Sequence, residues 1–313
     1  MPDTMQAVRQ HGYGGPEVLH LDEVARPVPG PGQVLVRVRA ASVNPIDWKL
    51  RTGALREMMP QTLPAGVGED FAGAVEQAGD GTGFRAGEAV YGMLPATRTG
   101  SYAEYVVIEA AGLARQPAGL GHEAAAAVLM GALTAWQGVV GQGGLEEGMA
   151  VLVHGAAGNV GGMAVQIAHA LGADVTGVAN EDALPRVREL NAGQAVSYRD
   201  NAPEGVAPGS QDIVFDTLGG AIQAASWALL KPGGILVSTL GIADPARAAA
   251  AGVRATGFGA APNGEQLRHV AEMIAAGQVR VAVGRVLPLA EAAQAQELNR
   301  TGAVKGKVVI AVG

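Results

Sequence analysis

One stretch carries more information about this chain than any other: Val151-Leu152-Val153-His154-Gly155-Ala156-Ala157-Gly158-Asn159-Val160-Gly161. Its apolar beginning is typical of a buried strand, its middle consists of small residues, and a helix-like pattern follows as far as Leu171. Small residues let a backbone approach a pyrophosphate closely. The first turn of a helix then offers that pyrophosphate free N–H groups and a positive dipole end.

The stretch therefore predicts a dinucleotide-binding loop; an ordinary tight turn between a strand and a helix is the alternative. Its glycines recur every three residues, although alanines fill the place of the second glycine of a G-x-G-x-x-G pattern. The residues expected to cradle the pyrophosphate belong to the loop and to the first helical turn: Gly155, Ala157, Gly158, Asn159, Val160 and Gly161.

Buried strands and amphipathic helices alternate along the chain on both sides of this loop. Strands are expected at residues 149–154, 174–179, 212–215 and 235–240, and helices at residues 123–140, 159–171, 182–190 and 221–230. Such alternation is typical of βαβ units, which build a doubly wound parallel sheet. We therefore expect an α/β protein whose Rossmann dinucleotide-binding domain covers residues 122–261.

The end of the second strand predicts which dinucleotide binds. Sites that prefer NAD place an acidic residue about 20 residues after the glycine loop, where it binds the ribose hydroxyls. Here the strand ends at the neutral Asn180, which would not repel a 2′-phosphate, and Arg186 and Tyr198 are candidate partners for that phosphate. Glu181 and Asp182 would oppose NADP if they pointed inward. The sequence predicts NADP(H) as the cofactor.

The first third of the chain has a different pattern. In residues 33–39 three valines share one face while Arg37 and Arg39 share the other, which is the period of a half-buried strand. Further short strands are expected at residues 71–77, 89–93 and 102–108, which favours a small barrel or sandwich. The tail is expected to rejoin this domain, which then comprises residues 1–121 and 262–313.

The composition excludes several kinds of chemistry. The chain has 313 residues and no cysteine, which excludes disulfides, thiol nucleophiles, iron–sulfur clusters and zinc sites that need thiolate. The 22 basic and 29 acidic side chains give a net charge of −7, and no basic run is present. This balance argues against nucleic acid or an anionic membrane surface as a partner.

The sequence gives no sign of a membrane segment or a secretory signal. Residues 1–12 contain no apolar run of the kind that secretory signals have. Residues 148–173 carry no formal charge and are long enough to cross a bilayer, but His154, Asn159 and a cluster of glycines interrupt them. A buried strand, a turn and a helix fit these residues better. We expect a cytoplasmic protein with no membrane partner.

Several further motifs are shared with a known family: Tyr13-Gly14-Gly15-Pro16-Glu17-Val18-Leu19, Ala41-Ser42-Val43-Asn44-Pro45-Ile46-Asp47-Trp48-Lys49, Gly100-Ser101-Tyr102-Ala103-Glu104-Tyr105-Val106, Ala132-Leu133-Thr134-Ala135-Trp136, Asp216-Thr217-Leu218-Gly219-Gly220, Leu230-Lys231-Pro232-Gly233-Gly234 and Gly306-Lys307-Val308-Val309. With these motifs and the glycine loop, the chain resembles the zinc-independent quinone oxidoreductase (zeta-crystallin-like) branch of the medium-chain dehydrogenase/reductase superfamily. The resemblance implies a GroES-like β-rich catalytic domain, built from both chain ends, into which the Rossmann domain is inserted.

The resemblance also implies a reaction. Zinc-dependent relatives carry a catalytic cysteine where this chain has Val43-Asn44-Pro45, and a Gly-His-Glu where it has Gly68-Glu69-Asp70. The implied activity is transfer of hydride from NADPH to a quinone or to the C=C bond of an α,β-unsaturated carbonyl, without zinc. Two alternatives stay open, namely an enoyl reductase dedicated to one biosynthetic pathway and a catalytically silent NADPH-binding structural protein.

Two residues in the resembling active-site segment are candidates for the chemistry. Lys49 is expected to donate to the substrate oxygen, with a solvated helical lysine as the alternative. Asn44 is expected to position the nicotinamide ribose or the substrate oxygen, unless it serves only as the turn former of the Asn-Pro pair. A small-molecule quinone or enone is thus the expected partner.

The cofactor side and the oligomeric state follow from the same resemblance. Thr134 is expected to reach a nicotinamide phosphate, and Leu240, Gly241 and Phe258 are expected to border the nicotinamide. Ordinary core packing is the alternative for Phe258. Family members are commonly dimers, so we expect a homodimer formed along the edge strand of the Rossmann sheet, at about residues 235–240 and onward.

Overall fold

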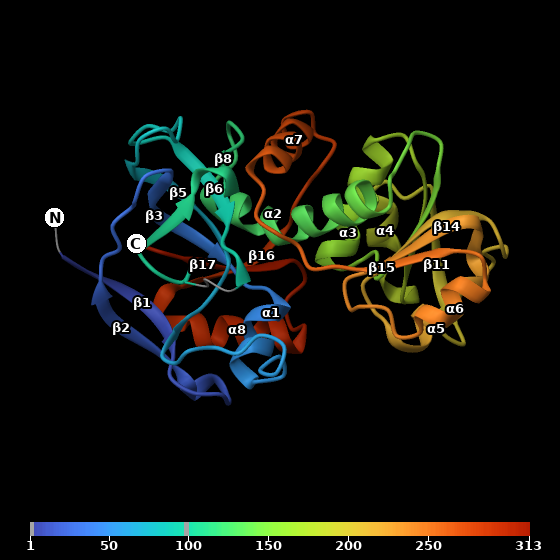
Figure 1. The fold of residues 1–313 in the computed structure, drawn as a ribbon, viewed down its shortest axis with the longest axis horizontal. Coiled ribbons are helices and arrows are strands. Elements are labelled where there is room, and N and C mark those ends of the chain that lie inside the picture. Colours follow the sequence, from blue (N-terminus) through green and yellow to red (C-terminus); the bar gives the residue numbers. More distant parts are fainter. Residues whose placement is uncertain (1–2, 97–99) are drawn as a thin grey trace. The chain divides into compact units, whose positions relative to one another are not determined.

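The computed structural model describes residues 3–96 and 100–313. The chain divides into two compact units (Figure 1). Unit 2 comprises residues 131–260 and 276–280, and unit 1 is built from the remaining residues at both ends of the chain. The first passage from unit 1 to unit 2 falls inside α2 (His122–Ala135), a helix that begins directly after the predicted boundary at residue 121.

Unit 2, all of whose residues the structure describes, is built on one seven-stranded sheet in the order β12-β11-β10-β9-β13-β14-β15. Neighbouring strands are parallel, except for the antiparallel pair β11 and β12. The strands are β9 (Ala150–His154), β10 (Asp174–Ala179), β11 (Gln194–Arg199), β12 (Ala202–Pro203), β13 (Gln211–Asp216), β14 (Leu230–Ser238) and β15 (Arg254–Gly257). From β11 to β15 this is the order of a doubly wound dinucleotide-binding sheet, whose order reverses beside its first strand, here β9. The predicted Rossmann-like parallel sheet is confirmed.

The helices of unit 2 follow the strands in alternation. They are α3 (Asn159–Ala170), α4 (Leu184–Glu189), α5 (Gly220–Ser226) and α6 (Pro245–Ala250), and α2 continues as a π-helical segment over Trp136–Gln142. Strand β9 is apolar throughout its centre because both faces of a parallel sheet are covered, and Val151, Leu152 and Val153 are fully buried. Residues 148–173 therefore form the predicted strand, turn and helix.

The helix expected at residues 221–230 is confirmed to within one residue. Helix α5 ends at Ser226, a 3-10 helix continues over Trp227–Leu229, and β14 begins at Leu230, where the chain takes up an extended, bulged path through Lys231-Pro232-Gly233-Gly234. One prediction at this end of the sheet is wrong. The edge strand was expected to begin at about residues 235–240, but those residues belong mainly to β14, which is not the edge. Strand β15, which is short and partly polar, pairs with β14 on its outer side.

Unit 1, over the residues that the structure describes, contains two sheets, and the larger one joins both ends of the chain. The larger has the order β16-β17-β3-β5-β6-β8, with β7 also paired to β3, and the smaller has the order β2-β1-β4. The strands are β1 (Thr4–Gln10), β2 (Leu19–Ala25), β3 (Gln33–Ser42), β4 (Ala65–Gly66), β5 (Asp70–Ala78), β6 (Ala89–Met93), β7 (Tyr105–Glu109), β8 (Leu113–Arg115), β16 (Val283–Pro288) and β17 (Lys307–Ala311). Because β17 pairs with β3, the tail rejoins the first part of the chain, as expected for a GroES-like domain.

Strand β3 lies at the centre of unit 1 and organises its core. Val34, Val36 and Val38 are buried while Arg37 is exposed, which confirms the predicted alternation. Helices α1 (Pro45–Thr52) and α8 (Ala292–Thr301) contact each other, and α7 (Gly264–Ala275) packs against β8. The turn from β3 into α1, together with α1 itself, carries the candidate catalytic residues of unit 1.

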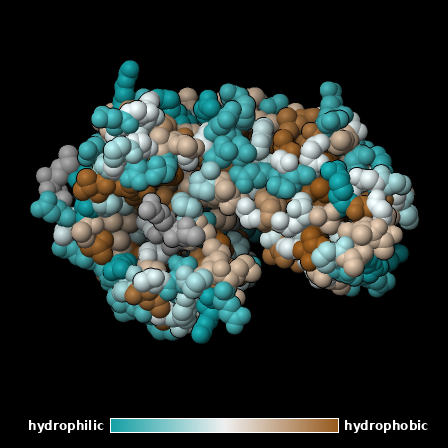
Figure 2. Space-filling model, viewed as in Figure 1, coloured by the Kyte–Doolittle hydropathy of each residue, from teal (hydrophilic) through white to brown (hydrophobic). Residues whose placement is uncertain are grey.

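One helical segment within the described residues, His122–Gln142, is long and apolar enough to cross a membrane by length and composition. The structure buries 67% of its most apolar window, so it also has the features of a core helix. On the face drawn in Figure 2, hydrophobic residues lie in small groups among hydrophilic ones.

Candidate functional site

The glycine loop between β9 and α3 has room for only small residues. Gly155 adopts a φ of +69°, and a Cβ placed on it would lie 2.5 Å from the Thr217 Oγ1. A Cβ on Gly161 would lie 2.2 Å from the Gly155 carbonyl oxygen. The loop closes on itself, since the Gly158 N–H donates to that same oxygen at 2.9 Å. Gly155 is therefore required by its positive φ, and Gly161 by close backbone approach.

The first turn of α3 presents unused N–H groups. Gly158 caps the helix, and its carbonyl accepts the Gly162 N–H at 2.8 Å. The N–H groups of Asn159, Val160 and Gly161 precede the first intrahelical bonds and have no acceptor within the described chain. They fit an anionic group at the positive end of the helix dipole.

Thr134 lies on the side of α2 that faces this turn. Gly131, one turn earlier on α2, packs so closely against Asn159 that a Cβ would lie 2.5 Å from the Asn159 Nδ2. Residues three apart share a helix face, and Thr134 is 7% exposed. The structure thus brings Thr134 to the same end of α3 as the glycine loop.

Three of the predicted phosphate-binding residues follow the carboxyl ends of β10 and β11. The Arg186 Nε, on α4, donates to the Ala157 carbonyl at 3.2 Å. The Tyr198 hydroxyl accepts the Gly155 N–H at 3.2 Å and is therefore turned toward the loop. Asn180 is exposed directly after β10, as are the acidic Glu181 and Asp182. Arg186 and Tyr198 meet the loop, whereas Asn180 faces solvent beside it.

The loops after β13 and β14 are held by a buried carboxylate that sequence reasoning did not single out as a site residue. Asp216 accepts the N–H groups of Leu218 and Gly219 at 2.9 Å each and the side chains of Gln223 and Ser238. The Gln223 amide also donates to the Gly241 carbonyl at 2.9 Å. An aspartate at the end of a buried strand is the signal that predicts such a network.

The residues expected to border the nicotinamide also lie at the carboxyl ends of the parallel strands. Leu240 is 54% exposed and Gly241, with a φ of +81°, follows it. Phe258 is half-buried directly after β15, and its N–H donates to the Ser238 carbonyl at 3.2 Å. Because parallel strands end at one edge, these residues lie on the side of the sheet that carries the glycine loop.

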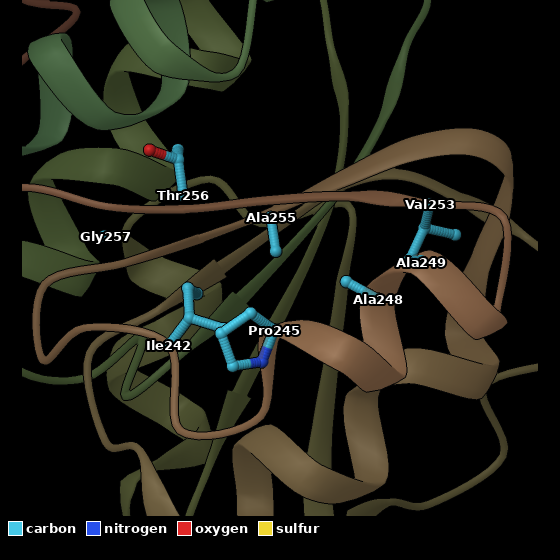
Figure 3. Close-up of a pocket in the computed structure, with 8 residues that line it drawn as sticks. All are labelled: Ile242, Pro245, Ala248, Ala249, Val253, Ala255, Thr256 and Gly257. Carbon is cyan, nitrogen blue, oxygen red and sulfur yellow. The ribbon is translucent and has the colours of Figure 1, made fainter.

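A separate hollow in unit 2 lies between α6 and β15 (Figure 3). It measures about 440 Å³ and is lined by Ile242, Pro245, Ala248, Ala249, Val253, Ala255, Thr256 and Gly257. Thr256 is the only one of these residues with a polar side chain, and none is ionisable. The hollow is therefore a poor candidate for the chemistry.

In unit 1, helix α1 carries the candidate catalytic residues at its two ends. Asn44 is the N-cap, and its N–H donates to the Asp47 Oδ2 at 2.7 Å in a capping box. Lys49 lies near the other end and is half-buried. Its ammonium is 5.7 Å from the centre of the Trp48 ring and has no hydrogen-bond acceptor among the residues that the structure describes. Lys49 is thus free to donate.

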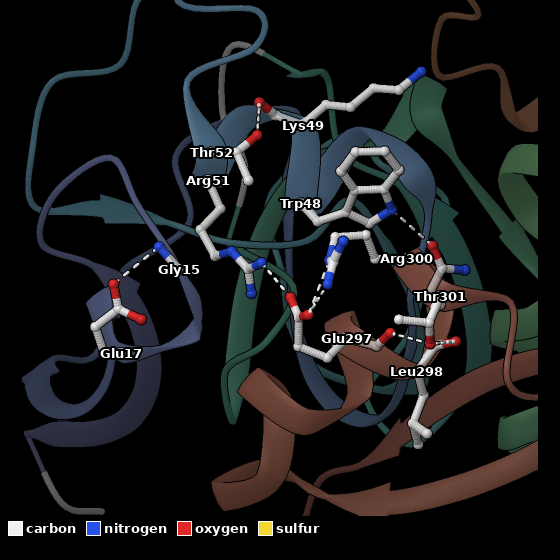
Figure 4. A network of polar contacts seen from close by, with 11 residues as sticks. Gly15, Glu17, Trp48, Lys49, Arg51, Thr52, Glu297, Leu298, Arg300 and Thr301 are labelled. Atoms are coloured by element: carbon white, nitrogen blue, oxygen red, sulfur yellow. Dashed lines mark hydrogen bonds and ion pairs between the residues drawn. The ribbon is translucent and has the colours of Figure 1, made fainter.

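A polar network fixes α1 against α8 (Figure 4). The Trp48 Nε1 donates to the Asn299 Oδ1 at 3.0 Å, and the buried Arg51 forms an ion pair with Glu297. Glu297 also pairs with Arg300, and hydrogen bonds from both arginines lower the pKa of Glu297 to about 2. In Figure 4 the Lys49 side chain points away from this network.

The Asn44 side chain, unlike the Lys49 ammonium, has its hydrogen-bond partners within the protein. It is 1% exposed, its Nδ2 donates to the Asp70 Oδ2 at 2.8 Å, and its Oδ1 accepts from the Lys307 Nζ at 2.6 Å. The Lys307 ammonium donates also to the Val43 carbonyl at 2.9 Å. Both ends of the Asn44 amide therefore bind protein groups, and its expected role toward a ribose or a substrate stays a prediction.

Burial controls the charges of this cluster. Desolvation raises the pKa of Asp47 to about 7 and, together with the nearby Asp47 and Asp70 carboxylates, raises the pKa of Glu69 to about 9. It also raises the pKa of Asp70 and lowers the pKa of Lys307, while the attraction between these two groups acts in the opposite sense on both. Glu69 therefore keeps its proton at pH 7. Lys307 is a further site residue that its place in the Gly306-Lys307 motif could have indicated.

These residues do not fit a zinc ion. Zinc takes cysteine, histidine and carboxylate ligands, and the chain has no cysteine. Within residues 3–96 and 100–313 no group of three histidine, aspartate or glutamate side chains is arranged to hold a metal ion. Where zinc-dependent relatives carry their cysteine, the Asn44 amide binds an ammonium group.

The fold and the site define a two-unit protein that joins a GroES-like β domain to a Rossmann-like dinucleotide-binding domain. Comparison with known families agrees: residues 30–118 match the alcohol dehydrogenase GroES-like domain, and residues 190–310 match the family described as zinc-binding dehydrogenase.

Individual relatives are similar over nearly the whole chain. The chain is 31% identical to the quinone oxidoreductase of Sus scrofa, over 98% of this chain and 97% of the relative. It is 31% identical to the 2-methylene-furan-3-one reductase of Solanum lycopersicum, over 99% of this chain and 80% of the relative. The solved structure of the quinone oxidoreductase from Coxiella burnetii superimposes with a TM-score of 0.88 at 32% identity, covering 99% of this chain and 100% of that one.

The chain belongs to the medium-chain dehydrogenase/reductase superfamily, in its quinone oxidoreductase (zeta-crystallin-like) branch. It is an oxidoreductase of the type of the quinone oxidoreductases and enone reductases, and it binds a nicotinamide cofactor. The predicted family and fold class are therefore confirmed.

Proposed function

We propose that this enzyme reduces quinones or the C=C bond of α,β-unsaturated carbonyls with NADPH and without zinc. The observation that carries the proposal lies at the carboxyl edge of the sheet in unit 2. There Arg186 lies on the glycine loop, and the neutral Asn180 stands where an NAD-preferring site has an acid. Relatives named quinone oxidoreductase and 2-methylene-furan-3-one reductase support the class of substrate.

The residues of unit 2 fit the cofactor in a simple way. The first-turn N–H groups of α3 would bind the pyrophosphate, Thr134 would reach the phosphate on the nicotinamide side, and Arg186 would bind the 2′-phosphate. When bound, NADPH supplies the hydride that reaches a carbon of the acceptor. The loops that contain Gly241 and Phe258 would border the nicotinamide end.

The chemistry left to unit 1 is stabilisation of an oxygen. As a quinone or a conjugated carbonyl accepts hydride on carbon, negative charge develops on its oxygen, and a placed donor stabilises that charge. Lys49 has a half-buried ammonium with no competing acceptor in the described chain, so it suits this role. Alcohol oxidation through an alkoxide would need a Lewis acid, and the donor set around Asn44 does not suit one.

Cofactor preference is the first test of the proposal. Arg186→Ala is expected to weaken NADPH binding by about 10–100-fold, the effect of losing charge-assisted hydrogen bonds, and to leave NADH binding nearly unchanged. The measurement is the dissociation constant of each cofactor by calorimetry. Arg188→Ala, on the exposed side of the same helix, is the matched control and should change neither. Equal weakening of both cofactors by Arg186→Ala would contradict a 2′-phosphate contact.

Turnover by a Lys49→Ala variant tests the assigned donor. We expect kcat/KM with an accepted enone or quinone to fall by about 10²–10³-fold, as when one oxyanion donor is removed, with NADPH binding unchanged. Lys305→Ala, also in unit 1 and exposed, is the control. An unchanged kcat/KM would remove Lys49 from the mechanism.

A panel of 1,4-quinones and enones separates the competing functions. Turnover of several acceptors supports the proposed reductase, and turnover of a single enoyl substrate favours the pathway-specific alternative. Failure of every acceptor to oxidise NADPH would favour a catalytically silent protein. The expected homodimer and cytoplasmic location stay proposals beside this function.

A further inference from the structure

A chain of buried hydrogen bonds runs beneath the glycine loop of unit 2. His154, the last residue of β9, is fully buried, and its Nε2 lies 2.8 Å from the Ser226 Oγ. Its Nδ1 lies 3.3 Å from the Tyr198 hydroxyl oxygen, which in turn accepts the Gly155 N–H at 3.2 Å. The Ser226 hydroxyl donates to the Ile222 carbonyl at 2.7 Å.

The direction of the bond between His154 and Ser226 follows from proton counting. Ser226 has one hydroxyl proton, and because it goes to Ile222 the serine oxygen accepts from the His154 Nε2. Burial lowers the pKa of His154 to about 4, so the ring is neutral and the Nδ1 carries no proton. The Nδ1, at 3.3 Å, is then one of two acceptors within reach of the Tyr198 hydroxyl proton; the other is the Val178 carbonyl at 3.4 Å. The phenol lone pairs are thereby aimed at the Gly155 N–H.

The same residues fix the shape of the loop. The His154 carbonyl accepts the Thr217 hydroxyl at 2.8 Å from the neighbouring strand, so the end of β9 is held from β11 and from β13. Tyr198 takes the N–H of Gly155, the Val178 carbonyl takes that of Ala156, and Gly155 takes that of Gly158. Within the described chain, the N–H groups of Ala157 and of Asn159 to Gly161 are left free. The loop is prepared for a pyrophosphate before any ligand binds.

We propose that His154 is a positioning residue for cofactor binding: it orients the Tyr198 hydroxyl onto the Gly155 N–H and so holds the glycine loop in its pyrophosphate-binding shape. Tyr198 then acts on the loop, which is a different role from the 2′-phosphate contact that the sequence predicts. The inference rests on the proposed function in one respect only, namely that a nicotinamide dinucleotide binds. It concerns the pyrophosphate, which NADPH and NADH share.

The test compares the two cofactors without any acceptor, so it does not depend on reductase activity. Dissociation constants of NADPH and NADH are measured by calorimetry for the wild type, Tyr198→Phe, His154→Leu and the double variant. Tyr198→Phe is expected to weaken both cofactors by the same factor of about 5–10, the loss of one hydrogen bond. His154→Leu is expected to weaken both at least as much, and adding Tyr198→Phe to it should cost nothing more. His154→Gln, which retains an acceptor and a donor, should restore part of the affinity.

A matched control and a second measurement keep the result interpretable. Ser197→Ala removes the neighbouring hydroxyl on β11, which binds Glu204 and not the loop, and should change neither cofactor. Hydrogen exchange of the loop amides 155–158 should rise in Tyr198→Phe and not in Ser197→Ala, whether or not His154→Leu folds. Weakening of NADPH alone by Tyr198→Phe, or additive losses in the double variant, would overturn the proposal. Equal affinity of the wild type for both cofactors would instead count against the NADPH preference alone.

Discussion

Replacing Lys307 by methionine is expected to lower the free energy of unfolding by about 3–5 kcal/mol, the cost typical of removing one partner from a buried charge pair. The substitution leaves the Val43 carbonyl and the Asn44 Oδ1 without the donor that now lies 2.9 and 2.6 Å away. It also removes the positive charge that opposes Asp47 and Asp70. Urea unfolding followed by circular dichroism measures the change, and hydrogen exchange in β17 and β3 assigns it to unit 1.

The chain offers a matched control two residues earlier. Lys305 is exposed, so Lys305→Met is expected to stay within about 0.5 kcal/mol of the wild type. Lys307→Arg retains the charge and should lose less than Lys307→Met. A Lys307→Met variant as stable as Lys305→Met would mean that the ammonium does not hold the cluster together.

The dinucleotide fold could be predicted because its signals are local. Residues 151–161 contain the strand, the turn and the start of the helix in one continuous stretch, and the close approaches that need Gly155 and Gly161 arise within it or from the adjacent strand. The spacing of later strands then indicated a parallel sheet. The edge strand β15 was not predicted because it is four residues long and partly exposed. It therefore lacks the apolar run of a buried strand.

The buried cluster around Asn44 could not be predicted in the same way. Its members come from residues 42–47, 69–70, 102 and 307, and only the pairing of β17 with β3 brings the last of them to the first. A lone lysine in a sequence is most often solvated, so the sequence does not distinguish the environment of Lys49 from that of Lys307. The structure separates them: Lys49 has a free ammonium, whereas Lys307 is 6% exposed and fully engaged.

The direction of a side chain was also beyond the sequence. Tyr198 was predicted near the cofactor phosphate from its distance along the chain, and it does lie at the glycine loop. Its hydroxyl lies within hydrogen-bond distance of His154 and of the Val178 carbonyl, which belong to two other strands. Specific roles therefore require the tertiary contacts, even where the location is predicted well.

The free energy of unfolding is expected to fall as the pH rises from 5 to 9. Asp47 and Glu69 have ordinary pKa values of 3.8 and 4.5, and folding raises them to about 7 and about 9. Between these values the folded state holds protons that the unfolded state has released. The stabilisation by Asp47 and Glu69 is complete at a pH below their ordinary pKa values. It is lost as the pH passes 7 for Asp47 and then 9 for Glu69. Each group contributes at most about 1.4 kcal/mol per pH unit over its range.

A Glu69→Gln variant separates the contribution of Glu69 from the rest. The amide keeps the shape and cannot ionise, so the loss of stability between pH 7 and 9 should become smaller, while the part due to Asp47 stays. Glu57→Gln, at an exposed position of unit 1, should keep the wild-type slope. Lys307 acts in the opposite direction at the alkaline end, because its lowered pKa lets the folded state release that proton first. Wild-type stability that stays constant or rises from pH 5 to 9 would contradict a protonated Glu69. The cluster around Lys307 would then carry more negative charge than its burial allows.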